Sequence, residues 1–139
     1  MTIATILIAL VIETGLNSSL LAEGSAFGLF GGASQAIIIS VINISFGLVI
    51  GMGAWPQTNH ISTIKSTLGY VYLVLGGTAV LIFNLLIGHY REVLIENPAD
   101  SGIAAVQQFS EGMFNLTEIE SIFLVVIGLL VASLSFWKG

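Results

Sequence analysis

Four polar side chains stand out within the long apolar stretches of this sequence, because their chemistry could do work there. They are Glu13, Asn17, Asn43 and Asn84. A carboxylic acid can take up and release a proton or bind a cation. Amide oxygens nearby can supply further hydrogen-bond acceptors or cation ligands. The four residues are therefore our candidates for a proton or ion path between helices.

A structural role is the alternative for the amides, to which Gln35 belongs as well. Hydrogen bonds between helices in a bilayer contribute about 0.6–2 kcal/mol each, which is reason enough for isolated asparagines in apolar helices. Glu13 differs, because a charged carboxylate at the centre of a membrane helix costs about 2.5–3.5 kcal/mol on insertion scales. Asn17 follows one helical turn later, on the same face. We expect Glu13 to face protein or water rather than lipid.

Other reactive patterns are weak. The chain has no cysteine, which excludes disulfides and thiolate metal sites. His60 and His89 fall in or beside different connections without the spacing of a helical metal site, so we expect both to be interfacial. No phosphate-binding loop, dinucleotide fingerprint or serine-nucleophile motif is present. We predict no enzymatic activity, no metal and no cofactor.

The composition indicates an integral membrane protein. Of 139 residues, 55% are hydrophobic and only 8% are charged, whereas about a quarter of an average globular domain is charged. The lipid bilayer is therefore an expected partner. Only three basic residues are present, too few for the phosphate contacts that nucleic acid requires.

A stripe of small residues runs through residues 24–64, a stretch with no charged side chain before Lys65. Small residues at every fourth position let another backbone approach closely, which is how helices commonly associate in lipid. We interpret the stripe as a helix-packing surface; a pore lining or a ring-forming helix is the alternative. Its members are Gly24, Gly28, Gly32, Ala36, Ser40, Gly47 and Gly51.

The apolar runs predict an all-α, polytopic membrane protein with about four transmembrane helices in a single domain covering residues 1–139. Because about 20 apolar residues span a bilayer, the helices are placed at residues 2–22, 33–54, 67–88 and 121–137. A turn is expected at residues 23–30, since an unbroken helix over residues 24–53 would be about 45 Å long. Trp55 and Pro56 are expected to end the second helix.

Residues 90–120 form the predicted extramembrane segment. Apolar residues recur there every three or four positions, which predicts one amphipathic helix lying on the membrane or on a partner. Its polar face carries acids rather than lysines, which favours a protein partner, and Glu111, Met113 and Phe114 are candidate docking residues. The recurring apolar residues are Ile103, Val106, Phe109, Met113 and Leu116. The acids expected on a solvated or partner-facing surface are Glu92, Glu96, Asp100, Glu111, Glu118 and Glu120.

The basic residues give the predicted orientation. With four spans, the N-terminus, Lys65 and Lys138 share one side of the membrane, and Arg91 lies on the other. Because cytoplasmic loops carry the excess of lysine and arginine, both termini are expected to be cytoplasmic.

Three functional hypotheses follow. The leading one is a small subunit that assembles laterally with other membrane proteins or with itself through the small-residue stripe. The second is a proton- or ion-conducting protein that works through Glu13. The third is the membrane anchor of a longer polypeptide.

Overall fold

The computed structural model describes residues 2–139, and every regular element in this range is an α-helix. Four helices are long and apolar enough to cross a membrane, as the composition predicts; the remaining one, α4, is short. The five helices are α1 (Thr2–Ala22), α2 (Gly28–Thr58), α3 (Thr63–Glu96), α4 (Ser101–Glu111) and α5 (Ile119–Lys138).

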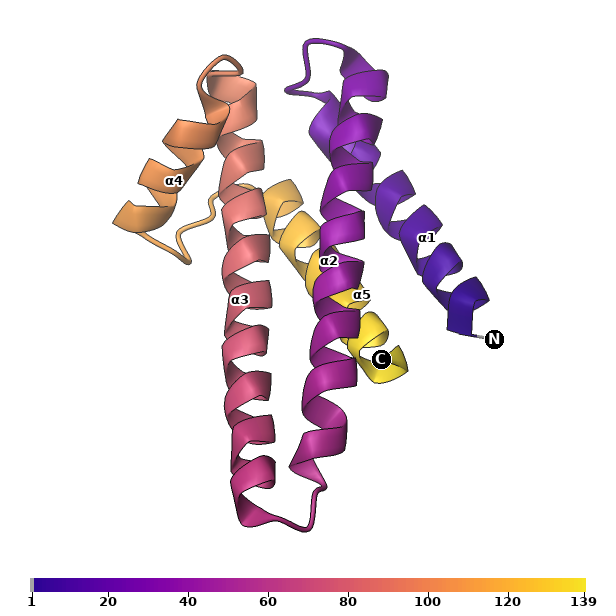
Figure 1. Cartoon of the computed structure of the whole chain (residues 1–139). Coiled ribbons are helices and arrows are strands. Elements are labelled where there is room, and N and C mark those ends of the chain that lie inside the picture. Colours follow the sequence, from indigo (N-terminus) through magenta and orange to yellow (C-terminus); the bar gives the residue numbers. More distant parts are fainter. Residues whose placement is uncertain (1) are drawn as a thin grey trace.

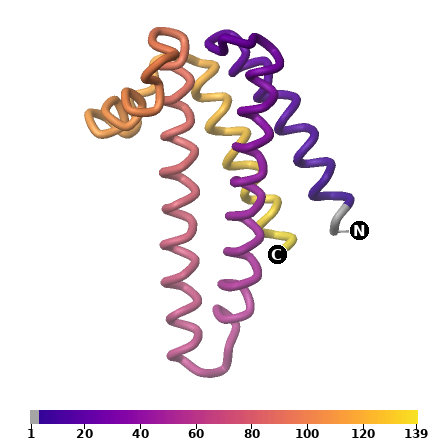
Figure 2. Tube along the Cα trace, turned by 45° about the horizontal axis from the view of Figure 1, so that its top comes forward, coloured from indigo at the N-terminus to yellow at the C-terminus, as the bar shows by residue number. Residues whose placement is uncertain are grey.

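Helix α2 is the centre of the bundle, packed against α1, α3 and α5 (Figure 1). Together α2 and α3 form a long antiparallel hairpin whose turn projects beyond the ends of α1 and α5 (Figure 2). The beginning of α1 and the end of α5 both lie toward that turn. Helix α4 and the α1–α2 turn lie at the opposite end, which we call the acidic end because Glu23, Glu92 and Glu118 are found there.

Helix α2 is longer than the sequence predicted at both ends. It begins at Gly28, the only position of positive φ (54°) among the described residues, where a side chain would be strained. The expected turn over residues 23–30 is therefore shorter, and the helix continues through Pro56 to Thr58. Pro56 lacks the N–H group that would bond the Met52 carbonyl, and the helix ends two residues beyond it.

Helix α3 also exceeds its predicted limits of residues 67–88, because the polar residues after Gly88 do not end it. His89, Arg91 and Glu92 are buried in its last turns, where each finds a hydrogen-bond partner inside the molecule. Helix α4 ends at Glu111, so the predicted amphipathic helix does not reach Leu116.

Two apolar clusters fill the bundle and leave a polar layer between them. The cluster nearer the acidic end contains Leu21, Ala36, Ile39, Leu94 and Leu124. The other, nearer the α2–α3 turn, contains Ile50, Ala54, Val80 and Ala132. The positions between them along α2, α3 and α5 include Asn43, Asn84 and Gly128, so the polar layer lies near the middle of the bundle.

Candidate functional site

Three helices each contribute one fully buried polar side chain to the middle of the bundle: Glu13 from α1, Asn43 from α2 and Asn84 from α3. Asn43 Nδ2 donates to Glu13 Oε1 at 2.7 Å and to Asn84 Oδ1 at 3.2 Å. Asn84 Nδ2 returns a hydrogen bond to Asn43 Oδ1 at 2.9 Å. With Asn17, these residues form what we call the polar centre.

A backbone carbonyl fixes the direction of every hydrogen bond in the polar centre. Asn84 Nδ2 donates to the Val80 carbonyl oxygen at 2.9 Å. A carbonyl can only accept, so the nitrogen of Asn84 must face Val80 and its oxygen must face Asn43. Asn43 therefore presents its own nitrogen to Glu13. Oε1 of Glu13 is consequently an acceptor, and any proton on this carboxyl group belongs on Oε2.

Helix α5 closes the polar centre with a glycine. A Cβ at Gly128 would overlap with Oδ1 of Asn84 and lie 2.7 Å from Asn43 Nδ2. Only a residue without a side chain allows α5 to pack directly over the amide pair. The close approach of α5 keeps both amides dry and paired with each other.

The remaining polar atoms of the centre have no hydrogen-bond partner within the described residues. These atoms are Oε2 of Glu13 and both Oδ1 and Nδ2 of Asn17, which is also fully buried. Ser40 lies beside the Glu13 carboxyl group, and its Oγ accepts a 3.4 Å hydrogen bond from Thr14. Buried polar groups are rarely left unpaired, so such atoms call for an explanation.

The structure thus brings together Glu13, Asn43 and Asn84 and places Asn17 on the same face of α1 as Glu13. Gln35 is separate from them, because its Nε2 donates to the hydroxyl of Tyr90 at 3.2 Å. Among the described residues, no group of three or more His, Cys, Asp or Glu side chains could hold a metal ion.

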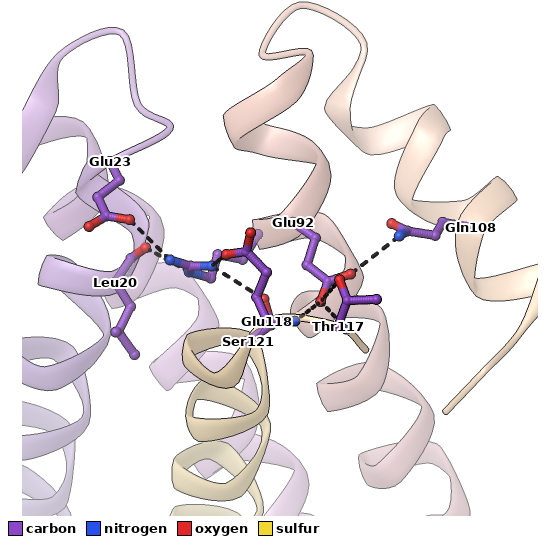
Figure 3. A network of polar contacts seen from close by, with 8 residues as sticks. Leu20, Glu23, Glu92, Gln108, Thr117, Glu118 and Ser121 are labelled. Carbon is purple, nitrogen blue, oxygen red and sulfur yellow. Dashed lines mark hydrogen bonds and ion pairs between the residues drawn. The ribbon is translucent and has the colours of Figure 1, made fainter. Parts of the chain in front are cut away.

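A second polar cluster lies at the acidic end, around Arg91, which is only 1% exposed. Its Nη1 donates to Glu118 at 2.7 Å, its Nη2 to Glu23 at 3.1 Å and its Nε to the Leu20 carbonyl at 3.1 Å (Figure 3). A weaker contact of 3.5 Å joins it to Ser121. One arginine therefore ties α3 to the end of α1 and the start of α5.

Glu92 points to the other side of α3 and holds the beginning of α5 (Figure 3). Its Oε1 accepts the backbone N–H groups of Thr117 and Glu118 at 2.7 and 2.9 Å, and its Oε2 accepts from Gln108 at 3.2 Å. A carboxylate at the N-terminus of a helix is favoured by the helix dipole. We call Glu23, Arg91, Glu92 and Glu118 the acidic-end cluster.

One sequence prediction about this region is wrong, because Glu92 is buried and internally bonded rather than solvated. His89, which we expected to be interfacial, is fully buried within the protein, with Nε2 3.1 Å from the Met113 carbonyl oxygen. The available signal was that Arg91 is the one basic residue among the acids of this region, since a lone guanidinium in such surroundings pairs with carboxylates.

The small-residue stripe contacts other helices of the same chain. At Gly32 a Cβ would meet the backbone of α1, and at Gly47 and Gly51 it would overlap with carbonyl oxygens of α5. A Cβ at Gly24 would lie 2.8 Å from Leu94 of α3, and Ala36 and Ser40 are fully buried. Gly28 makes no such contact and serves the α1–α2 turn instead.

The candidate docking residues lie outside the core. Glu111 is exposed, and Met113 and Phe114 are 36% and 72% exposed. On α4 the inward face is formed by Ser101 and Ala105, so the apolar side chains of Ile103 and Val106 point outward instead of packing on α3.

No protein-family model matches the sequence, and no curated protein or solved structure is significantly similar to it. The protein is therefore characterised by its own fold and by the geometry of its site. It is an all-helical protein with four helices long and apolar enough to cross a membrane and a buried carboxyl group at the middle of its bundle.

Proposed function

We propose that this chain is an integral membrane protein that crosses the bilayer four times and conducts protons through Glu13. The lengths of its helices support the membrane part of this proposal. The α3 segment from Tyr72 to Arg91 is about 28 Å long at 1.5 Å per residue, close to the hydrocarbon thickness of about 30 Å. This placement puts α4 at one membrane surface and the polar centre well inside the bilayer.

The observation that carries the proton-conducting role is the half-satisfied carboxyl group of Glu13. Asn43 binds Oε1, whereas Oε2 has no partner within the described residues. A purely structural link between α1 and α2 would be made equally well by glutamine, without the cost of a buried ionisable group. A group that must gain and lose a proton needs one oxygen held in place and one oxygen free to exchange.

The proposal is tested by proton flux in vesicles that contain the purified full-length chain. We expect the wild-type chain to dissipate an imposed pH gradient, reported by a dye sealed inside the vesicles. The Glu13→Gln variant keeps the hydrogen bond from Asn43 but cannot exchange a proton, so its flux should fall to that of empty vesicles.

Glu96→Gln is the matched control, because it makes the same chemical change at an exposed position near the end of α3. Its flux should equal that of the wild type. Two results would overturn the proposal: wild-type vesicles that hold their gradient, or a Glu13→Gln chain that conducts as well as the wild type.

We also propose, as the second candidate, a subunit that assembles with another membrane protein or with a copy of itself. The supporting observation is the outward apolar surface of α4 and the following segment, formed by Ile103, Val106, Met113 and Phe114. The small-residue stripe supports this role less, because α1 and α5 already occupy it. A bulky substitution at Gly47 would disturb the fold itself and could not report on assembly alone.

Native mass spectrometry after gentle extraction from the source membrane tests assembly. A fixed stoichiometry that is lost on Phe114→Ser, with Phe30→Ser as a control at an exposed site on α2, would support docking through this surface. A monomer in both the wild type and the variants would contradict it. For the orientation, we propose that both termini are cytoplasmic, since Lys65 and Lys138 lie at the same end of the bundle as the termini.

A further inference from the structure

We propose that the segment after α4, residues 112–118, inserts its outward apolar side chains into the surrounding bilayer and anchors the acidic end of the bundle to zwitterionic lipid. The inference rests on the membrane placement in the proposed function and goes beyond it. Phe114, which is 72% exposed, is the principal anchor, and Met113 lies next to it in the chain. The depth of the segment, the bonds that hold it and the charges around it support this role.

The contacts of the segment with α3 set its depth. His89 Nε2 lies 3.1 Å from the Met113 carbonyl oxygen, and a Cβ at Gly88 would lie 3.1 Å from a methyl group of Leu116. Both α3 residues precede Arg91, which marks the acidic end of the proposed membrane-spanning part of α3. At 1.5 Å per residue they lie about 3–5 Å nearer the middle of the bilayer than Arg91. The segment therefore lies on the bilayer side of Arg91.

The path of the chain agrees with this depth. Figure 1 shows the segment after α4 reaching further toward the α2–α3 turn than the beginning of α5, to which it then returns. The first turns of α5 expose Ile119, Ile122 and Phe123, which face lipid in the proposed placement. The outward side chains of the segment are therefore continuous along the chain with a lipid-facing surface.

This depth corresponds to the boundary between headgroups and acyl chains. An amphipathic element at this boundary buries its apolar side about 5–10 Å into the lipid. Irregular backbone exposed to lipid does not occur deeper in the hydrocarbon, because its polar groups would lack partners there. The backbone of the segment therefore stays at the boundary, and only the side chains of Met113 and Phe114 enter the acyl region.

The segment is held in place from both sides of its outward residues. The N–H group of Asn115 donates to the Gly112 carbonyl oxygen at 2.9 Å and closes a turn. Glu92 Oε1 accepts the N–H groups of Thr117 and Glu118 at 2.7 and 2.9 Å. The outward direction of the apolar side chains is thus part of a bonded structure, which presents them to the lipid without further ordering.

The charges around the segment select the class of lipid. No lysine or arginine occurs between Arg91 and Lys138, and the exposed Glu111 directly precedes the segment. Amphipathic elements that bind anionic lipid carry lysine and arginine on their polar face. A zwitterionic headgroup can instead bring its ammonium group close to the carboxylate of Glu111.

The second candidate function would have a protein cover the same side chains, and depth favours lipid. Helix α4 begins beyond Glu96, the last residue of α3, which lies about 7–8 Å outside Arg91 at 1.5 Å per residue. Ile103, near the beginning of α4, is 68% exposed. We therefore expect water around Ile103 and lipid around Phe114, although the two side chains are similarly apolar and similarly exposed.

Spin labels on single cysteines test this difference. The chain has no cysteine of its own, so each variant carries one label. The full-length Phe114→Cys, Ile103→Cys and Leu130→Cys chains are labelled and reconstituted in phosphatidylcholine vesicles. Electron paramagnetic resonance then compares collisions with oxygen, which concentrates among acyl chains, and with a nickel chelate, which stays in water.

The label of Phe114→Cys should collide mainly with oxygen and that of Ile103→Cys mainly with nickel. Leu130→Cys, at an exposed site in the middle of α5, is the reference for the bilayer interior and should collide with oxygen alone. Because all three sites are exposed, the labels should leave the fold intact. Added phosphatidylglycerol should not increase the oxygen preference at Phe114→Cys.

The reference separates failure of the anchor from failure of the proposed function. Nickel contact at Phe114→Cys, with Leu130→Cys in lipid, would overturn the anchor alone. A Phe114→Cys label shielded from both reagents would show that protein covers the site and would overturn the lipid occupant. An oxygen preference that required phosphatidylglycerol would overturn the choice of zwitterionic lipid. Nickel contact at Leu130→Cys would overturn the membrane placement, and the proposed function with it.

Discussion

The polar centre is buried, as are Arg91 and Glu92 of the acidic-end cluster, but the two regions differ in how completely their hydrogen bonds are satisfied. At the acidic end, Arg91 donates to two carboxylates and a carbonyl, and both oxygens of Glu92 are bound. In the polar centre, one oxygen of Glu13 and the whole amide of Asn17 lack partners within the described residues.

This difference distinguishes a hydrogen-bond network that stabilises the fold from a carboxyl group that is still able to react. A fully satisfied network fixes the positions of the elements that it joins, and every change to it costs stability. The second oxygen of Glu13 has no hydrogen bond within the described residues to offset its burial, so this carboxyl group is kept at a cost in stability. We therefore propose that the acidic-end cluster serves the architecture and the polar centre the function, and substitutions should distinguish them.

The largest expected effect is from Gly128→Ala, which forces a side chain onto the amide pair. The new Cβ would displace Asn84 and break its hydrogen bonds with Asn43. At about 0.6–2 kcal/mol per hydrogen bond between membrane helices, the loss of two should lower the free energy of unfolding by about 1–4 kcal/mol, and the displacement of Asn84 adds to this loss. Titration of the detergent-solubilised chain with a denaturing detergent, followed by tryptophan fluorescence, measures this change.

Gly77→Ala is the control for this prediction, because a Cβ there would meet no atom within 4 Å. Alanine is the better helix former, so the control should be neutral or stabilising by up to about 1 kcal/mol. Equal effects of the two substitutions would show that Gly128 does not seal the polar centre.

The next largest effect is from Arg91→Met at the acidic end. Hydrogen bonds to charged groups contribute about 1.5–3 kcal/mol each, but the Glu23 and Glu118 side chains are 67% and 48% exposed and can return to water. We expect a loss of about 2–3 kcal/mol in the free energy of unfolding. Lys65→Met, on the exposed opposite end, should change it little, and an unaffected Arg91→Met chain would remove the acidic-end cluster from the architecture.

These two clusters also show how much of the structure could be predicted from the sequence alone. Length and apolarity predicted the all-helical fold and four long apolar helices, because the number of apolar residues in each run is a local property. Glu13, Asn43 and Asn84 were singled out for the same reason, since a polar residue inside an apolar run is conspicuous, and the structure brings the three together.

What the sequence did not reveal depends on contacts between distant residues. Nothing in the order of residues indicated that Arg91 would reach Glu23 and Glu118, or that Glu92 would hold the start of α5. Nothing in the sequence singled out Gly128, because its role needs the amide pair on the neighbouring helices. Helix ends were also misplaced, since buried partners let α3 continue through charged residues.

The same substitution in the two clusters should have opposite effects on stability. Glu92→Gln weakens the hydrogen bonds to the N–H groups that begin α5 and should lower the free energy of unfolding by about 1–2 kcal/mol. Glu13→Gln keeps the acceptor for Asn43 and removes an ionisable group, so it should raise the free energy by about 1 kcal/mol, as stabilising changes at functional sites do.

Denaturation of both variants under one set of conditions checks this pair. The sign is the informative quantity, because any loss of solubility or purity would lower both values together. A destabilised Glu13→Gln chain would mean that the carboxylate itself is needed for packing, and the polar centre would then be architectural like the acidic-end cluster.

The smallest expected effect lies at the rim of the acidic-end cluster, where Glu23 and Glu118 share Arg91. Exposed ion pairs contribute about 0–1 kcal/mol, so Glu23→Gln should cost less than about 0.5 kcal/mol and its effect should vanish at high salt. Glu118→Gln should cost more, because its bond to Arg91 is shorter, 2.7 Å against 3.1 Å, and the side chain is less exposed. Denaturation at low and high salt compares the two. If Glu23 proved the more important and its effect persisted in salt, the guanidinium would be held mainly from the α1 side.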